Sequence, residues 1–278
     1  LRKLPIRAIE PVFEHWQWLF EKRLLEASEG ILVLSRFTRS LIEEHFPSVD
    51  TGRVKIIPGG VDADRFRPSE DRTALRRELG MDDGSVYLIT VRNLSPRMGL
   101  ENRVGAMARV AAGEEGKKAD VRLHVCGEGR LRPVLEARIR ELGLAERVTL
   151  LGRVTDDELV RRYQAADLFV LPTQAMEGFG IVTVEALATN LPVVGTPAGA
   201  TPEILGPIDE ELITRDTSSD AIAEGIERWL ARRSELEGTT RYRDEVMAKY
   251  SWERVTDRVE EYYEEMNERH RHSPGRAV

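Results

Sequence analysis

The residues best suited to chemistry are two glutamates, Glu177 and Glu185, which flank a loop that contains Gly178 and Gly180. Glycine lets a backbone approach a ligand closely. The free N–H groups at the start of the helix expected at 181–189 suit a phosphate. A glutamate about one turn into that helix can accept hydrogen bonds from ribose hydroxyls, and one before the loop can do the same for a sugar ring. The spacing therefore points to binding of a nucleoside diphosphate that carries a sugar.

The sequence around this loop alternates between short apolar runs and helical stretches. Buried strands are expected at 86–91, 121–126, 148–151, 167–171, 191–195 and 211–214. Helices are expected to follow them at 100–112, 131–142, 156–165, 181–189, 202–205 and 218–233. This alternation predicts an α/β fold, a Rossmann-like parallel sheet with helices on both faces. Ligands of such sheets bind at the carboxyl ends of the strands, where the glycine-containing loop lies.

Further elements are expected at both ends of the chain. The N-terminal part should form a helix, a strand, a second helix and a second strand, at 5–27, 30–35, 36–45 and 53–58. Ser35 is placed to cap the second of these helices. Residues 240–269 are helical in pattern and strongly charged, and Ser251 is expected to start a second helix there.

Composition excludes several classes of protein. The net charge of −7 over 278 residues gives no basic character of the kind that binds nucleic acid. The single cysteine, Cys126, rules out an intramolecular disulfide framework and fits the cytoplasm. No apolar run approaches the roughly 20 residues that span a bilayer. The histidines lack metal-ligand spacing, so we expect no metal site.

An apolar stripe on the first helix, which includes Trp16 and Phe20, could touch a membrane or a lipid acceptor. We favour packing against other protein, so that any membrane contact is at most peripheral. The chain begins with Leu rather than Met, and we therefore expect a fragment, a processed product or a trimmed chain.

The segment from Glu177 to Glu203 resembles the donor-site signature of retaining glycosyltransferases of family 4. It reads Glu-Gly-Phe-Gly, then Glu185, then Leu-Pro-Val-Val-Gly-Thr and Gly-Ala-Thr-Pro-Glu-Ile-Leu. The resemblance covers about residues 28–265. It implies the GT-B architecture of two facing Rossmann-like domains, with the nucleotide sugar mainly on the C-terminal one.

The resemblance also implies a domain division. Residues 1–57 are similar only to the end of the N-terminal, acceptor-side domain. Residues 58–235 correspond to the donor-binding Rossmann-like domain, and residues 236–278 to C-terminal charged helices and a tail. An N-terminal domain of this family is longer than residues 1–57, so a missing domain or a partner chain is expected.

By the same resemblance, the backbone of Gly178, Phe179 and Gly180 contacts the diphosphate. Glu185 anchors the ribose. Glu177 contacts the donor sugar and steadies the charge that develops at its anomeric carbon. We therefore expect Glu177 to take part in catalysis.

The loop at 92–99 departs from the family pattern. Family members place an arginine and a lysine where this chain has Asn93 and Met98, and those cations hold the leaving diphosphate. Arg92 and Arg97 each lie one residue away. Arginine can bridge phosphate oxygens, so Arg97 is expected to replace the lysine in catalysis and Arg92 to assist in donor binding.

Other residues match weaker motifs beside the donor. They are the loop Gly127, Glu128 and Gly129 near the nucleotide, Arg153 and Val154 at the base edge, Thr173 near a phosphate or the sugar, and Gly60 in the interdomain linker.

These observations favour the donor-binding part of an enzyme that transfers a sugar from a UDP- or GDP-linked donor to an acceptor hydroxyl with retention of configuration. The nucleotide sugar is a co-substrate, and no other cofactor is expected. The acceptor, whether a glycan, a lipid-linked molecule or a small molecule, stays open. The alternative is a non-catalytic nucleotide-sugar-binding or regulatory subunit that needs a partner chain. An NAD-dependent enzyme is disfavoured because no Gly-x-Gly-x-x-Gly follows the first strand of the series.

Overall fold

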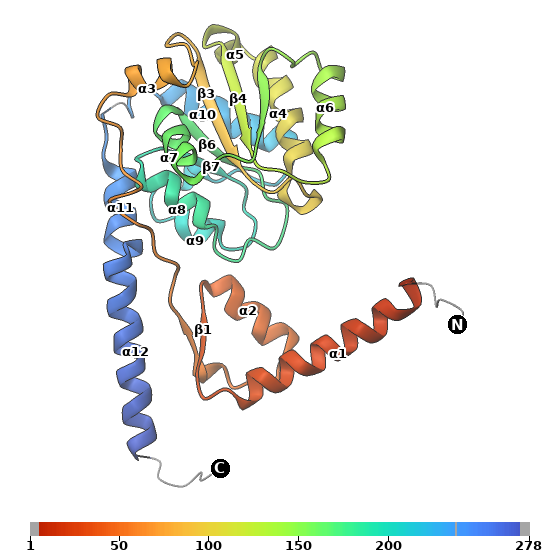
Figure 1. Cartoon of the computed structure of the whole chain (residues 1–278), viewed down its shortest axis with the longest axis vertical. Helices are drawn as coiled ribbons and strands as arrows, with labels where there is room; N and C mark the ends of the chain where they lie inside the picture. The colour runs from red at the N-terminus through yellow and green to blue at the C-terminus, as the bar shows by residue number, and fades with distance from the viewer. Residues whose placement is uncertain (1–5, 237, 273–278) are drawn as a thin grey trace. The chain divides into compact units, whose positions relative to one another are not determined.

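The computed structural model describes the backbone of residues 6–236 and 238–272 and the side chains of residues 15–236 and 238–271. The chain divides into two compact units (Figure 1). The smaller unit consists of residues 1–58 and 258–278, and the larger consists of residues 59–257.

The larger unit is built on a five-stranded parallel sheet in the order β5-β4-β3-β6-β7. Its strands are β3 (Val86–Val91), β4 (Val121–Cys126), β5 (Val148–Gly152), β6 (Leu168–Leu171) and β7 (Val193–Gly195). Successive side chains of a strand point to opposite faces, so each strand contributes to two cores. Leu88 packs into one core and Ile89 into the other.

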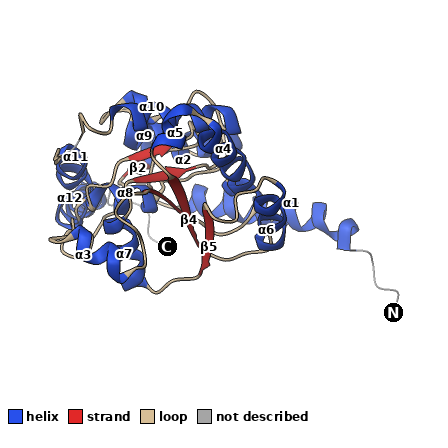
Figure 2. Ribbon diagram, turned by 90° about the horizontal axis from the view of Figure 1, so that it is seen from above, coloured by secondary structure: helices blue, strands red, loops and turns tan. Residues whose placement is uncertain are grey.

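Helices cover both faces of this sheet (Figure 2). One face is covered by α4 (Leu100–Ala112), α6 (Arg132–Glu141) and α10 (Ser219–Arg232), with α5 (Glu114–Lys118) beside α4. The other face is covered by α7 (Asp156–Ala165), α8 (Ile181–Ala188), α9 (Thr201–Leu205) and α11 (Arg241–Tyr250). The α/β fold with a Rossmann-like parallel sheet, predicted from the alternation of elements, is confirmed.

Two details differ from the sequence-based expectation. The strand expected at 211–214 is wrong: residues Glu210–Leu212 form a 3-10 turn, and Ile213 makes a single bridge to Gly195. The Asp209 side chain accepts a hydrogen bond from the backbone N–H of Glu211 at 3.0 Å, which favours the turn over an extended strand. Helix α5 was not anticipated, because its five residues are too few for a periodic apolar pattern.

In the smaller unit, β1 (Ile31–Val33) and β2 (Val54–Ile56) form a two-stranded parallel sheet. They pack with α2 (Arg36–His45), and Ser35 caps this helix by accepting a hydrogen bond from the N–H of Thr38 at 3.0 Å, as predicted. Helix α1 (Ile6–Ala27) precedes β1, and α12 (Trp252–His272) ends in this unit. Trp16 and Phe20 of the apolar stripe are exposed. None of the described helices is long and apolar enough to cross a membrane.

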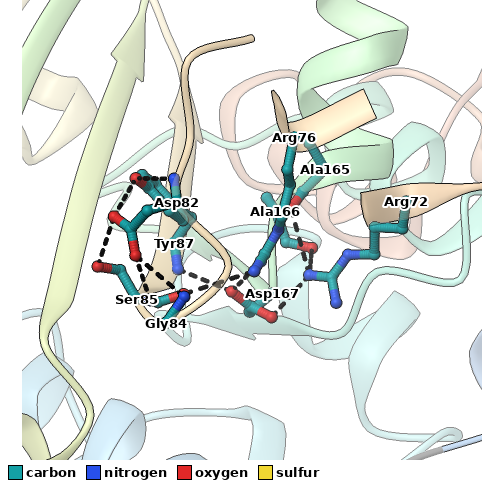
Figure 3. Close-up of polar contacts among 9 residues, drawn as sticks. All are labelled: Arg72, Arg76, Asp82, Gly84, Ser85, Tyr87, Ala165, Ala166 and Asp167. Atoms are coloured by element: carbon teal, nitrogen blue, oxygen red, sulfur yellow. Dashed lines mark hydrogen bonds and ion pairs between the residues drawn. The ribbon is translucent and has the colours of Figure 1, made fainter. Parts of the chain in front are cut away.

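Asp167, just before β6, holds the amino end of the large sheet together (Figure 3). One carboxylate oxygen accepts the backbone N–H of Tyr87 in β3 at 2.7 Å and also a hydrogen bond from Arg76. The other accepts Arg72 at 2.6 Å. Both arginines belong to α3 (Arg72–Glu78) and also donate to the carbonyl of Ala165 at the end of α7. One carboxylate therefore fixes β3, β6 and two helices relative to one another.

Arg103 in α4 contrasts with Arg76. Its side chain is fully buried, and none of its three guanidinium nitrogens has a hydrogen-bond partner. Burial lowers the pKa of Arg103 to about 9. A buried cation without a partner destabilises a fold by its lost hydration.

We expect Arg103→Met to stabilise the larger unit by about 1–3 kcal/mol, because methionine keeps the apolar stem and removes the unpaired charge. Arg76→Met should destabilise it, because Asp167 would lose a buried partner. Urea denaturation followed by circular dichroism measures both. A lower midpoint for Arg103→Met would mean that Arg103 has a stabilising partner.

Candidate functional site

The strand order of the large sheet reverses between β3 and β6. The chain runs outward from β3 through β4 to β5, and then returns to place β6 and β7 on the other side of β3. Ligands of open α/β sheets bind at the carboxyl ends of the strands where this reversal occurs. Two loops meet at that point, residues 92–99 after β3 and residues 172–180 after β6. The N–H of Gln174 in the second loop donates to the carbonyl of Arg97 in the first at 3.0 Å.

A buried polar group joins the two loops. Arg92 donates to the Thr173 hydroxyl at 2.8 Å and also to a carboxylate oxygen of Glu177. The Thr173 hydroxyl donates to the same oxygen at 3.0 Å. The side chains of Arg92 and Glu177 are only 9% and 11% exposed, so water screens their attraction little. Burial lowers the pKa of the Arg92 guanidinium, and the carboxylate of Glu177 opposes that shift.

The structure thus brings together three predicted site residues, Arg92, Thr173 and Glu177. Arg92 and Glu177 bind each other directly. The guanidinium of Arg92 faces Glu177, which leaves its Nε buried without a hydrogen-bond partner. In this arrangement Arg92 orients Glu177. The expected contacts of Arg92 with phosphate and of Glu177 with a sugar stay predictions.

The glycine loop, residues 177–180, is held by close backbone packing. The N–H of Ala200 donates to the carbonyl of Glu177 at 2.8 Å, and a Cβ on Gly199 would lie 2.2 Å from that oxygen. Gly180 has a φ of 88°, a left-handed conformation that side chains disfavour, and it starts α8. Phe179 is buried, with its ring 5.8 Å from that of Tyr250. The start of α8, where a phosphate is predicted, is therefore rigidly placed.

Glu185 lies in the second turn of α8 and is half-buried. The hydroxyl of Tyr163, in α7, donates to one of its carboxylate oxygens at 3.2 Å. Burial raises the pKa of Glu185, and the hydrogen bond from Tyr163 opposes that shift. Sequence reasoning missed Tyr163. The available signal was a tyrosine on the apolar face of a predicted helix, since a buried hydroxyl needs a partner.

A cavity of about 290 Å³ opens beside these groups at the carboxyl ends of β3, β4 and β5. Its walls are mainly apolar and include the first turn of α8. The lining residues are Val91, Arg92, Asn93, Met98, Cys126, Gly127, Arg153, Val154, Leu159 and Val182. Four predicted site residues therefore line it: Arg92, Gly127, Arg153 and Val154. Burial raises the pKa of the Cys126 thiol to about 12, so this wall carries no reactive thiolate.

The loops that follow β3 and β4 are joined by backbone hydrogen bonds beside the cavity. The N–H of Arg92 donates to the carbonyl of Cys126 at 2.9 Å, and that of Leu94 donates to the carbonyl of Glu128 at 2.8 Å. A Cβ on Gly127 would lie 2.0 Å from the carbonyl oxygen of Arg92, and one on Gly129 would lie 2.4 Å from that of Leu94. Both glycines are thus required by loop packing, and Glu128 between them is exposed.

Arg97 and Gly60 are among the predicted residues outside this cavity lining. Arg97 is exposed, and its Nη1 donates to the carbonyl of Met176, just before the glycine loop, at 3.2 Å. Gly60 packs against Trp252, whose ring would lie 2.5 Å from an added Cβ. The next residue, Val61, forms a bridge with Ser251.

The two departures from the expected cation pattern have different surroundings. Both line the cavity, but Asn93 is exposed, whereas Met98 is buried and packs with the core. Among the described residues, no group of three or more His, Cys, Asp or Glu side chains could hold a metal ion.

Comparison with known proteins gives a consistent family. Residues 71–246 match the family model described as glycosyl transferases group 1. The chain is 30% identical over 239 residues to a GDP-mannose-dependent monoacylated alpha-(1-6)-phosphatidylinositol monomannoside mannosyltransferase of Corynebacterium glutamicum, a match that covers 81% of this chain and 59% of that protein. This match and two further curated relatives are longer than the chain, which spans between 52% and 59% of their length.

Solved structures share the fold. HepE from Anabaena, in complex with UDP and glucose, superposes with a TM-score of 0.78 at 21% identity and covers 89% of this chain and 66% of its own. The C-terminal domain of a glycosyl transferase group 1 family protein, LpcC from Francisella tularensis, superposes with a TM-score of 0.60 at 25% identity. That match covers 69% of this chain and all of that domain, 100%.

The buried pair of Arg92 and Glu177 predicts a stability effect. Glu177→Gln should destabilise the larger unit by about 1–3 kcal/mol, because Arg92 would keep a buried charge without its counterion. Glu245→Gln is the matched control, since Glu245 pairs with Lys249 at 2.9 Å on the surface and should contribute about 0.5 kcal/mol or less. Urea denaturation measures both, and equal midpoint shifts would contradict a special role for the buried pair.

Proposed function

Because the chain belongs to the glycosyl transferases group 1 family, we propose that it is the donor-binding part of a retaining glycosyltransferase of the GT-B type. Its substrate is a nucleoside diphosphate sugar, and its reaction transfers the sugar to an acceptor hydroxyl. The observation that carries the proposal is the reversal of strand order between β3 and β6, because it gathers the glycine loop, both glutamates and the cavity at one edge of the sheet.

The nucleotide occupies the cavity and the start of α8. The apolar walls at Val91, Val154 and Leu159 accept the flat face of a base, and the backbone at Arg153 and Val154 meets its edge. The ribose lies against Glu185. The diphosphate lies against the N–H groups of Gly178, Phe179 and Gly180 and the first turn of α8.

Arg97 supplies the cation at the diphosphate. It is exposed and donates to the carbonyl of Met176, directly before the glycine loop, so its guanidinium lies close to the loop that is predicted to hold the diphosphate. The bond from the anomeric carbon to the diphosphate breaks, the acceptor oxygen forms its bond on the same face, and the proton of the acceptor hydroxyl passes to the leaving diphosphate oxygen. Negative charge grows on the leaving diphosphate, which a preorganised arginine stabilises.

Glu177 orients the sugar. Its carboxylate is fixed by Arg92 and Thr173, so a sugar hydroxyl would meet an acceptor that does not need to reorganise. The same negative charge would stabilise positive charge at the anomeric carbon.

A second candidate is a nucleotide-sugar-binding subunit that needs a partner chain for turnover. The burial of Met98 favours it, because the position that carries a lysine in the family pattern holds an apolar side chain packed in the core. This candidate predicts donor binding without transfer or hydrolysis.

Calorimetric titration with UDP, GDP and ADP tests nucleotide binding. We expect one of them to bind with a dissociation constant between about 1 µM and 1 mM. Glu185→Ala should weaken that binding by about tenfold or more, because it removes a charged acceptor of the ribose hydroxyls. Glu245→Ala, which changes a helix glutamate that pairs with Lys249, should leave the affinity unchanged. Failure of the wild-type chain to bind any of the three would overturn the proposal.

Hydrolysis of the matching nucleotide sugar tests the role of Arg97. Arg97→Met should lower the turnover rate by about a hundredfold, because it removes the donor that stabilises the leaving diphosphate. Arg138→Met is the control, since Arg138 pairs with Glu141 on the exposed side of α6. Wild-type binding with no hydrolysis, and with no transfer when a separate N-terminal domain is added, would select the second candidate.

A further inference from the structure

We propose that Tyr163 is a positioning residue for the nucleotide, which holds the carboxylate of Glu185 in the orientation that accepts the ribose hydroxyls. The assignment rests on the proposed function and deepens it, because it makes ribose the specificity element of the site. Tyr163 lies in α7, which none of the recognised motifs includes.

The hydroxyl of Tyr163 has little freedom to move. The residue is fully buried, its ring packs edge-on against Phe169 with centroids 5.7 Å apart, and Phe66 lies 6.3 Å away. Its hydroxyl donates to the Oε2 atom of Glu185 at 3.2 Å. A ring held from two sides by other rings presents its hydroxyl at a fixed point, so the carboxylate that accepts this bond is fixed as well.

The bond leaves acceptor capacity on Glu185 for a ligand. A carboxylate has two oxygens with about four lone-pair positions. Among the described residues, Tyr163 is the one side chain that donates a hydrogen bond to this carboxylate. Glu185 is half-buried rather than buried, so the residue as a whole is not closed off from a ligand.

The group that donates a hydrogen bond to the Glu185 carboxylate is uncharged, and no charged side chain contacts this carboxylate among the described residues. Arg65 and Asp156 act on the carboxylate from a distance with opposite signs, and Arg65 is itself engaged near Asp156 and Asp157. Burial raises the pKa of Tyr163 well above its usual value, so the hydroxyl keeps its proton at neutral pH. Tyr163 can therefore orient Glu185 without neutralising the charge that makes it a strong acceptor.

The consequence is discrimination between ribose and deoxyribose. A site built to accept a hydroxyl rejects a ligand that lacks it, because the buried acceptor is then left unpaired. If Tyr163 fixes that acceptor, the discrimination should depend on the tyrosine hydroxyl, whereas the affinity for the rest of the nucleotide should not.

The experiment combines Tyr163→Phe with deletion of the ligand hydroxyls. Calorimetry would give dissociation constants for UDP or GDP, whichever binds, and for its 2′-deoxy and 3′-deoxy forms. The wild-type chain should prefer the ribonucleotide by about tenfold over at least one deoxy form. Tyr163→Phe should weaken ribonucleotide binding by about fivefold and binding of that deoxy form by less than about twofold, so that the preference for the ribonucleotide falls to about two- to fourfold.

Tyr87→Phe is the matched control. Tyr87 is also a buried tyrosine whose hydroxyl donates to a carboxylate, that of Asp82 at 3.0 Å, but it lies at the amino end of the sheet. Its substitution should leave the ribose preference unchanged. Glu185→Asp is a second variant. It keeps Tyr163 but shortens the carboxylate side chain by one methylene, which moves the carboxylate away from the Tyr163 hydroxyl. It should also lower the preference for the ribonucleotide.

The outcomes separate this proposal from the proposed function. Equal weakening of both ligands by Tyr163→Phe, or an unchanged ribose preference in Tyr163→Phe or Glu185→Asp, overturns the role of Tyr163 while nucleotide binding stands. Absence of binding to the wild-type chain overturns both. A lower preference in Tyr163→Phe and Glu185→Asp, with Tyr87→Phe unaffected, supports the assignment.

Discussion

The adjacency of β3 and β6 is the constraint on which the rest of the larger unit depends. These two strands are far apart in sequence, and three helical crossovers and two other strands separate them. An arginine–carboxylate contact holds them at each end. At the amino end Asp167 joins the backbone of Tyr87 to α3, and at the carboxyl end Arg92, directly after β3, meets Glu177. Loop closure over such distances costs entropy, and buried ionic contacts of this kind favour one register over its alternatives.

The two contacts differ in what surrounds them. At the amino end, Arg72 and Arg76 make further hydrogen bonds besides those to Asp167, because both also donate to carbonyls at the end of α7. The carboxyl-end contact is smaller and retains an unused buried donor, the Nε of Arg92. It also lies against a cavity. The unused donor of Arg92 thus distinguishes the carboxyl end. A cavity does not, because Arg72, Arg76 and Asp167 line one of about 620 Å³ at the amino end.

Much of this arrangement could be predicted from the sequence. The bounds of β3, β4, α4 and α7 follow from their apolar periods, and the Rossmann-like sheet follows from the alternation of elements. The identity of the loops at the site also follows, because they directly succeed strands. Side-chain pairing could not be predicted in the same way. Arg92 and Glu177 are 85 residues apart in the chain, and no local pattern shows that their charges would meet. Tyr163 was missed for the same reason, and the strand expected at 211–214 failed because Asp209 stabilises a local turn.

The bridge between Val61 and Ser251 brings the two ends of the larger unit together. The N–H of Val61 donates to the carbonyl of Tyr250 at 2.8 Å, so the chain segments at which the larger unit begins and ends lie side by side. A unit whose two ends meet can be inserted into, or removed from, a longer polypeptide without a long linker. Its ends could also be joined and new ones opened in an exposed loop. The sheet and its cavity thus belong to a unit whose two chain ends are neighbours.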